Sequence, residues 1–298
     1  MKQELFPTNQ SRPCIQGGPC IPLFAGIQLH YLSLTGESFS VHHEPSDHSM
    51  VINYCKNGRI GWQTENGTYI YLGAGDFSVH TRGSSLDTRI ELPNGSYEGL
   101  SIDIDVAEMT RNPPELFSGT GISGSALYEK LCRCGTLIPF TGEVQTDAIF
   151  QFFYDQPPIT QPVYQKLKTL ELLLYLFHSQ TLSPQRATKY QSEQIELIRQ
   201  IHDYLSDHLG QRITIEELSK QYLMNPTTMK ALFKSVYGTS IAAHMKEHRM
   251  RQAAKLLLES EMSIAEIALA VGYDSQSKFS TAFKEFFHTL PKEYRKKR

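Results

Sequence analysis

The chain has 298 residues, of which 40% are hydrophobic and 20% charged, a composition typical of a globular protein and not of a disordered one. This length exceeds that of one ordinary domain and suits about two. There is no run of about eighteen apolar residues and no apolar segment at the start, which excludes a helical membrane span and a signal peptide and predicts a cytoplasmic location.

Charge is distributed unevenly along the chain. Residues 191–298 carry 16 Lys/Arg and 13 Asp/Glu, which leaves 13 basic and 18 acidic residues before them. A basic C-terminal part beside an acidic N-terminal part favours a polyanionic partner for the former. The five cysteines include Cys132 and Cys134, but no second Cys/His pair follows at zinc-finger spacing. We therefore expect reduced cysteines and no structural metal or cofactor.

The first part of the chain alternates strand-like segments with turns. Residues 1–22 are rich in Pro, Gly and Cys and predict an irregular arm. From residue 24 to residue 105, short β-type runs such as 69–72 and 97–104 are separated by Asn-Gly and Gly-rich turns. Many short strands at this spacing predict a sandwich or small barrel.

A helical segment and a polar stretch follow the strands. Residues 164–178 predict an amphipathic helix whose apolar face packs on the strands or contacts a second copy of the chain. That face consists of Leu167, Leu170, Leu174 and Phe177. Residues 179–191 are polar and are typical of a linker. We therefore expect one domain over 23–178 and a second, helical domain over 192–298.

The C-terminal part contains a diverged internal repeat. Thr214 with Glu217, and forty-nine residues later Ser263 with Glu266, are capping boxes that each open a short helix. A second helix follows each short one, the first beginning at Asn225-Pro226 and the other at or near Ser275. The offset between the copies is then fifty, which a one-residue insertion near Gly272 explains.

The second helix of each copy has an apolar side and a polar side. The residues expected to face inward are Met229, Leu232, Phe233 and Val236 in the first copy and Phe279, Ala282, Phe283 and Phe286 in the second. Two short helices joined by a tight turn, with the second one buried on one side, form a helix-turn-helix unit. We predict such units over about 214–237 and 263–287, joined by a long helix over 240–259. A helical packing domain with solvated polar faces is the alternative, and the presence of two copies favours DNA binding.

A series of short motifs runs through residues 193–298. They are Leu232-Phe233-Lys234, Gly238, Arg249, the segments 253–257 and 264–268, Val271-Gly272-Tyr273, Ser277-Lys278-Phe279, Phe283-Lys284 and the segment 291–295. With these motifs the region resembles the DNA-binding domain of the AraC/XylS family of transcription regulators. The resemblance implies two recognition helices that enter successive major-groove segments on one face of double-stranded DNA.

The resemblance also implies which side chains contact the DNA. By position these are Thr227, Lys230, Ala231 and Lys234 on the first recognition helix and Gln276, Ser277, Lys278, Ser280 and Thr281 on the second. Ala231 and Thr281 stand where the family often has arginine, and neither can make the bidentate contact of arginine with guanine. The base preference of other members is therefore not transferable. His288 stands where the family has a late glycine, which leaves the local turn open.

The family often carries a small cupin-like barrel in front, which senses an effector or mediates dimerisation. The strands over 24–105, with the turn at 72–76, resemble that barrel. The expected fold class is therefore α+β with two domains: a cupin-like barrel with a helical extension, then an all-α domain. The partners implied are promoter DNA, RNA polymerase, a small-molecule effector and a second copy of the chain, and no membrane.

The N-terminal domain offers two kinds of candidate site. A metal interpretation of His42, His43, Glu44 and His48, with His80 as a later ligand, is weaker than a polar loop and a structural histidine, because the ligand spacing is loose. Four aromatic residues are candidates for an effector pocket, and a plain core is equally consistent with them. These are Tyr54, Trp62, Tyr69 and Tyr71.

Two other functions stay open at this point. A cupin-type metal enzyme with a helical appendage needs a convergent His/carboxylate set in the barrel, which the sequence does not offer. A DNA-binding protein without an effector needs only the C-terminal domain. We expect no enzymatic activity and a regulator that binds an organic effector without a metal.

Overall fold

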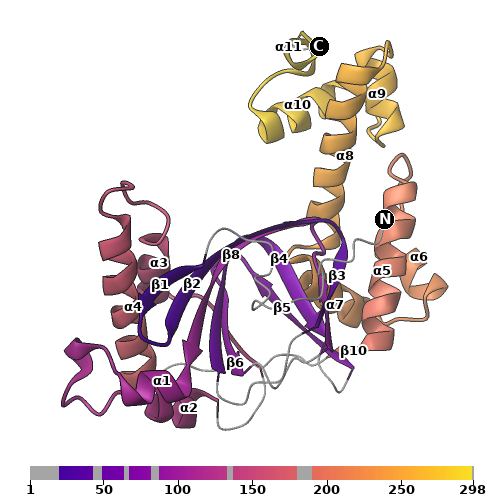
Figure 1. Ribbon diagram of the computed structural model, residues 1–298. Coiled ribbons are helices and arrows are strands. Elements are labelled where there is room, and N and C mark those ends of the chain that lie inside the picture. The colour runs from indigo at the N-terminus through magenta and orange to yellow at the C-terminus, as the bar shows by residue number, and fades with distance from the viewer. Residues whose placement is uncertain are drawn as a thin grey trace. The chain divides into compact units, whose positions relative to one another are not determined.

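The computed structural model describes residues 20–42, 49–63, 67–81, 87–132, 137–179 and 190–296. The chain forms two compact units, unit 1 over Met1–Gln191 and unit 2 over Ser192–Arg298 (Figure 1). Unit 1 combines a sheet with helices, and the described part of unit 2 is helical. No helix in the described ranges is both long and apolar enough to cross a membrane.

Unit 1 is built on ten described strands in one hydrogen-bonded network. They are β1 (Ile21–Phe24), β2 (Ile27–Thr35), β3 (Ser38–His42), β4 (Ser49–Gln63), β5 (Thr68–Gly73), β6 (Phe77–Thr81), β7 (Asp87–Glu91), β8 (Ser96–Asp105), β9 (Ile138–Phe140) and β10 (Tyr190–Gln191). The main path runs β1-β2-β8-β4-β5-β10, while β7 joins β3 to β4 and β6 joins β9 to β4. All ladders are antiparallel.

Strand β4 links two parts of this network. Its first half pairs with β6 and β8, and its second half pairs with β5 and β7. The change occurs at an irregularity between Cys55 and Asn57. The next residue, Gly58, has φ +78, and a Cβ there would lie 2.2 Å from the carbonyl oxygen of Ser96. Only glycine fits this bend, so Gly58 determines where β4 passes from one part of the network to the other.

The sheet of unit 1 stays open within the described residues. Strands β1, β3, β9 and β10 each pair with a single neighbour, so the ladder does not close on itself there. The expected mixture of a β-rich N-terminal part and a helical C-terminal part is confirmed. The cupin-like barrel stays a prediction.

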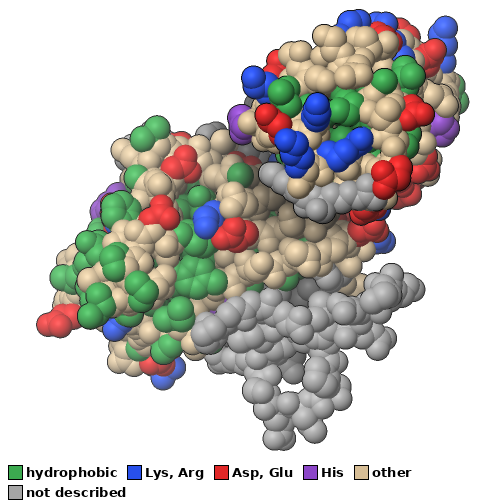
Figure 2. Space-filling view, turned by 90° about the horizontal axis from the view of Figure 1, so that it is seen from above, with side chains coloured by type: hydrophobic (Ala, Val, Ile, Leu, Met, Phe, Trp, Pro, Cys, Tyr) green, Lys and Arg blue, Asp and Glu red, His purple; other side chains and the backbone are tan. Residues whose placement is uncertain are grey.

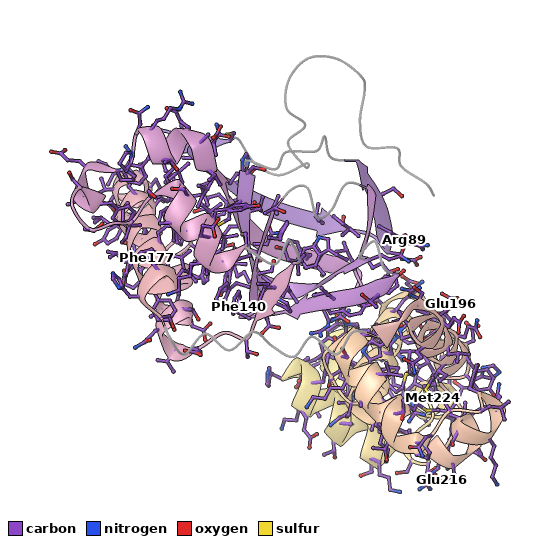
Figure 3. All side chains as sticks on the ribbon, turned by 90° about the horizontal axis from the view of Figure 1, so that it is seen from below. Arg89, Phe140, Phe177, Glu196, Glu216 and Met224 are labelled. Carbon is purple, nitrogen blue, oxygen red and sulfur yellow. The ribbon has the colours of Figure 1, made fainter. Side chains whose placement is uncertain are left out.

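Four α-helices and a 3-10 turn accompany the sheet. They are α1 (Val106–Arg111), η2 (Glu115–Phe117), α2 (Gly124–Leu131), α3 (Val144–Gln151) and α4 (Gln161–His178). One core lies between these helices and the strands, where Phe150 and Phe153 meet Tyr54 and Phe77. A second core, around Trp62, is built from strand residues, apart from Leu92 and Leu137. Phe140 of β9 and Phe177 of α4 are labelled in Figure 3.

The packed face of α4 differs from the predicted one. The helix begins at Gln161, and its buried apolar residues are Leu170, Leu172, Leu173 and Leu176. Leu167 and Leu174, which the helical period placed inward, are 50% and 39% exposed. The helix carries apolar residues on two adjacent sides, and the periodicity alone does not tell which side meets the sheet.

Cysteine chemistry in unit 1 agrees with the expectation of reduced thiols where the structure describes it. Cys55 and Cys132 are buried free thiols. Burial raises the pKa of each to about 12, which keeps the thiol protonated and unreactive at neutral pH. Cys14 and Cys134 lie outside the described residues.

Unit 2 consists of seven helices in the described range. They are α5 (Ser192–Asp207), α6 (Ile215–Gln221), α7 (Pro226–Tyr237), α8 (Ile241–Glu259), α9 (Ile264–Ala270), α10 (Gln276–Phe287) and α11 (Pro291–Arg295). The long helix α8 contacts α5 and α7 on the one hand and α9, α10 and α11 on the other (Figure 1). The inward positions predicted for α8 are buried: Ile241, Met245, Ala253 and Leu257.

Both predicted capping boxes form. The Thr214 hydroxyl accepts from the N–H of Glu217 at 3.2 Å, and the Glu217 carboxylate accepts from the N–H of Thr214 at 2.7 Å. In the second copy the corresponding distances between Ser263 and Glu266 are 3.2 and 2.6 Å. Each box satisfies two N–H groups that the first turn of the helix leaves without an intrahelical partner.

We expect Ser263→Ala to lower the free energy of unfolding by about 1 kcal/mol at neutral pH, because α9 loses its N-cap acceptor. Hydrogen bonds from Ser263 lower the pKa of Glu266 below its ordinary value of 4.5. The contribution of the box is therefore fully present above that value and is lost as the pH falls through the lowered pKa. Urea unfolding of the full chain, followed by circular dichroism at pH 7 and pH 4, measures both effects. Ser277→Ala, inside α10, is the control and should change stability by less than about 0.5 kcal/mol.

Candidate DNA-binding surface

The first helix-turn-helix unit consists of α6, a short turn and α7. The Asn225 side chain accepts from the N–H of Thr227 at 2.9 Å, and Pro226 occupies the first helical position. Met224, labelled in Figure 3, lies in the turn and is buried. The inner side of α7 is the predicted one, with Met229, Leu232, Phe233 and Val236 at most 1% exposed. This packing fixes which side of α7 faces outward.

The outer side of α7 presents the first set of predicted DNA contacts. All four side chains are exposed: Thr227, Lys230, Ala231 and Lys234. They follow the helical spacing of three and four residues, so they share one face of the helix. Two cations on a short exposed face suit contact with phosphates or base edges.

The second unit consists of α9, its turn and α10. The Ser275 hydroxyl accepts from the N–H of Lys278 at 3.3 Å and caps α10. Gln276, Ser277, Lys278 and Thr281 are exposed, while Ser280 is half-buried. Lys278 pairs with Asp274 at 3.3 Å, and the Thr281 hydroxyl donates to the Ser277 carbonyl at 3.1 Å. The first turn of α10 therefore presents three exposed polar side chains in a row.

The core under α10 is aromatic, and the prediction for one of its members, Phe286, is wrong. Phe279 and Phe283 are fully buried and Ala282 is 8% exposed, but Phe286 is 37% exposed. Its neighbour Phe287 packs inward instead, with its ring centroid 4.7 Å from that of Phe283 and 5.1 Å from that of Tyr294. Helix α11 brings Tyr294 to the end of α10, and this tertiary contact selects Phe287 over Phe286.

The two turns confirm the insertion that the repeat predicted. Leu223 and Gly272 follow equivalent helix ends and both have positive φ, 50° and 80°. One residue separates Leu223 from the N-cap Asn225, and two separate Gly272 from Ser275. A Cβ on Gly272 would lie 2.6 Å from the Leu209 carbonyl oxygen, so the second turn requires glycine both for its conformation and for space.

The recognition helices also end alike. Gly238 closes α7 with φ 80, and His288 closes α10 with φ 56 and ψ 20, both in the left-handed region. The N–H of each donates to the carbonyl four residues before it, at 2.8 Å. His288 therefore makes the same left-handed turn as Gly238 of the first unit, at the conformational cost of a side chain in this region.

We expect His288→Gly to raise the free energy of unfolding by about 1 kcal/mol, because glycine adopts the left-handed conformation without the steric cost. The reverse change, Gly238→His, should lower it by a similar amount. Thermal unfolding of the full chain under identical conditions compares the two variants with the parent. Equal shifts of the same sign would contradict this explanation.

Several cations of unit 2 serve the fold. Arg249 donates to the Gln211 carbonyl at 3.0 Å and Arg295 to the Met262 carbonyl at 2.5 Å. Lys246 pairs with Glu285 at 3.0 Å. Figure 2 shows Lys and Arg mixed with Asp and Glu on the visible face of unit 2. The basic excess of this region therefore does not form one uniform patch on that face. Position in the fold, more than charge, distinguishes α7 and α10 from the other helices of unit 2.

The four aromatic candidates of unit 1 do not share one face. Tyr54 belongs to the core under the helices and stacks on Phe150, with ring centroids 4.1 Å apart. Trp62 lies in the strand core beside its cross-strand partner Ile70. Residues that alternate along a strand face opposite ways, so Tyr69 and Tyr71 lie on the other face of β5 from Ile70.

Tyr69 and Tyr71 are the two candidates that the structure brings together. Their rings are stacked with centroids 6.0 Å apart, and both side chains are buried. The Tyr71 hydroxyl donates to the Glu91 carboxylate at 3.2 Å, and the Arg59 guanidinium lies 5.9 Å from the Tyr71 ring centroid. A Cβ on Gly61 would lie 2.3 Å from the Tyr71 ring, so this glycine makes room for it.

The candidate metal ligands of unit 1 are described only in part. His43, Glu44 and His48 lie outside the described residues, as does the side chain of His42, and His80 is buried on β6. Sequence reasoning overlooked three histidines of unit 2 that the structure brings together: His202, His244 and His248. The separation of four residues between His244 and His248 was the available signal, because it places both on one helical face.

Comparison with known proteins identifies relatives of both units. A family described as a helix-turn-helix domain matches residues 218–297. The HTH-type transcriptional regulator AlkR of Acinetobacter baylyi is 40% identical over 82 residues, which are 28% of this chain and 27% of AlkR. The arabinose operon regulatory protein of Escherichia coli K12 is 31% identical over 99 residues, 33% of this chain and 34% of that protein. The chain therefore matches only about a third or less of these two relatives.

A third relative is similar over most of its length. The thermoregulatory protein LcrF of Yersinia pestis is 27% identical over 253 residues, which cover 78% of this chain and 89% of LcrF. Neither unit alone is long enough for such a match, so the similarity extends over residues of both.

Proposed function

The chain carries a DNA-binding domain of the AraC/XylS family, and from this premise we propose that the whole protein is a sequence-specific transcription regulator. The observation that carries the proposal is the pair of capped helix-turn-helix units on one compact unit, each with a buried inner side and an exposed polar face. All three relatives named above are regulators by name. Double-stranded promoter DNA is the partner.

We propose that the exposed faces of α7 and α10 read the DNA. Lys230 and Gln276 are the central candidates, because each lies on the exposed side of its helix and can reach a base edge. Lys234 and Lys278 suit phosphate contact. The short side chains of Thr227, Ala231, Ser277, Ser280 and Thr281 allow the helix backbone to approach the groove closely.

We propose that residues 23–178 of unit 1 are a cupin-like sensor, with an arm over residues 1–22 before it and a linker over 179–191 after it. Strands β1 and β10 extend into the ends of these two segments. Its effector is a small organic molecule, and Tyr69 and Tyr71 are the side chains best placed to contact it. A stacked pair of phenols beside the Glu91 carboxylate offers apolar contact and hydrogen bonding together. Trp62 lies on the neighbouring strand but faces the side of Ile70, so we propose no contact between Trp62 and the effector.

We propose that the regulator is a homodimer joined through α4 of unit 1. Leu167, Leu174 and Val163 on this helix are 50%, 39% and 60% exposed, and Phe152 nearby is 39% exposed. Figure 2 shows hydrophobic side chains spread over the surface of unit 1. Exposed apolar residues that gather on one helix are typical of a protein interface.

We expect the double variant Leu167→Glu, Leu174→Glu to weaken self-association at least about 10-fold, because it buries two charges in the proposed interface. Sedimentation equilibrium of the full chain at micromolar concentration measures the change. Leu116→Glu is the matched control, since Leu116 is 71% exposed in the same unit but lies outside α4. A parent protein that is monomeric at these concentrations contradicts the dimer.

The experiment that tests the proposed function is selection of bound sequences from a random DNA library by the full chain. We expect enrichment of one motif with two parts, and transcription by RNA polymerase that changes when the motif precedes a promoter. Binding without any sequence preference would instead support a DNA-binding protein of architectural type and would refute the proposal.

A further inference from the structure

Three histidines meet inside unit 2, on helices other than α7 and α10. His202 lies on α5, and His244 and His248 lie on α8. One ring nitrogen from each lies within 4.8 Å of the others. Within the described ranges this is the one group of three His, Cys, Asp or Glu side chains that converges in this way.

The fold explains why the three side chains converge. His244 and His248 are four residues apart on one helix, so their side chains lie one above the other on the same face. Helix α5 packs against that part of α8 and adds His202 from the opposite side. The ring centroids are 4.5 Å apart for His244 and His248, and 5.1 and 5.3 Å apart for His202 with each of them.

The environment of His244 suits a residue that coordinates a metal more than it suits a surface histidine. Its side chain is 5% exposed, and its buried Nε2 has no hydrogen-bond partner. Neutral imidazole is the form of histidine that binds metals. A buried polar atom without a partner is otherwise costly and uncommon.

His202, the third histidine, has a carboxylate neighbour that can orient its ring. His202 Nδ1 lies 3.1 Å from the Asp203 carboxylate. When Nδ1 holds the ring proton and donates it to Asp203, the lone pair of Nε2 is available to a metal. A carboxylate on the distal nitrogen of a ligating histidine is a recurrent support of metal sites.

We propose that His202, His244 and His248 form a site for a divalent transition-metal ion of the zinc class. Three neutral imidazoles are the donor set that Zn²⁺, Co²⁺, Ni²⁺ and Cu²⁺ share, whereas Mg²⁺ and Ca²⁺ require oxygen ligands. Tetrahedral coordination at about 2.0–2.1 Å places ligand nitrogens about 3.3 Å apart. The ligand nitrogens lie within 4.8 Å of one another, so the rings would turn toward the ion to reach this separation. His202 and His248 are half-buried, and a water molecule would complete the coordination.

The position of the site suggests what the ion does. The His202 ring stacks on Tyr237, the last residue of α7, with centroids 4.5 Å apart, and the Tyr237 and His244 rings are 4.8 Å apart. An ion held by α5 and α8 would therefore tie together the two helices that support the C-terminal end of the first recognition helix. Its role is structural, and it does not depend on the regulatory function proposed above.

The test uses the purified full chain after removal of metals with a chelator. Co²⁺ is titrated and followed by its visible absorption, and Zn²⁺ is then added in competition. We expect one ion per chain, displaced by Zn²⁺. His202→Gln and His248→Gln should each weaken binding at least about 10-fold. His178→Gln, which removes an exposed histidine of unit 1, should leave it unchanged.

Circular dichroism shows whether each variant keeps its helices, and X-ray absorption of the Zn²⁺-loaded parent protein gives the ligands without any substitution. Three imidazole nitrogens in the zinc shell support the site. Sulfur ligands, the absence of stoichiometric binding, or equal binding by all three variants would overturn it and would show that the histidines only pack against one another.

Discussion

Phe283→Ala is expected to lower the free energy of unfolding of unit 2 by about 3–5 kcal/mol and to abolish specific DNA binding. Phe283 is fully buried in the second helix-turn-helix unit, where its ring meets those of Phe279, Phe287 and Tyr294. Removing the ring leaves a cavity that three aromatic neighbours on two helices cannot readily fill. The loss is a large part of the stability of an ordinary domain of this size.

The matched control is Phe286→Ala, three residues further along the same helix, α10. Phe286 is 37% exposed, so the same chemical change should cost far less than at Phe283. Urea unfolding of the full chain, followed by circular dichroism, compares the two variants. Trp62 is the only tryptophan and lies in unit 1. Its fluorescence therefore tests whether unit 1 unfolds at the same urea concentration in the variants as in the parent. Equal losses in the two variants would contradict the assigned core.

The features of unit 2 that the sequence predicted are those with local causes. A hydroxyl followed three residues later by glutamate defines the start of α6 and of α9, and Asn225-Pro226 defines the start of α7. These signals act within one helical turn, so they can be recognised without knowing the tertiary structure. The repetition of the pattern then indicated paired helix-turn-helix units.

The errors occurred where a neighbouring element decides between two local alternatives. Phe286 and Phe287 are adjacent at the end of α10, and only the contact of Tyr294 from α11 makes Phe287 the packed one. On α4, Leu172 and Leu173 are buried in the core that the strands and helices of unit 1 share, while Leu167 is exposed. Helical periodicity predicts that an apolar face exists, but the element that covers it is set by the tertiary fold.

Candidate sites were harder to predict than elements for the same reason. Tyr54 and Trp62 lie on the same strand, β4, yet they belong to two different cores because the strand passes from one sheet to the other at Gly58. His244 and His248 could have been paired from their spacing. His202 lies more than forty residues earlier, and only the packing of α5 on α8 brings it to them.

Lys230→Ala and Gln276→Ala should each relax base preference by about 1–3 kcal/mol, and in different halves of the DNA site. Lys230 lies on α7 and Gln276 on α10, and both side chains are exposed. Recognition helices of paired units are expected to reach major-groove segments about one helical turn, ~34 Å, apart. The two substitutions should therefore act on separate base pairs, and their free-energy costs should add in the double variant.

Binding of each variant to a panel of single-base changes in the selected site measures the effect at a fixed salt concentration. Lys255→Ala and Gln252→Ala are the matched controls, because both residues are exposed on α8, outside the recognition helices. They should leave base preference unchanged. Relaxation at the same base pairs in the Lys230 and Gln276 variants would rule out two separate contacts. A uniform loss of affinity for every sequence would assign the changed residue to the phosphate backbone, because phosphate contacts hold the protein on DNA without reading its sequence.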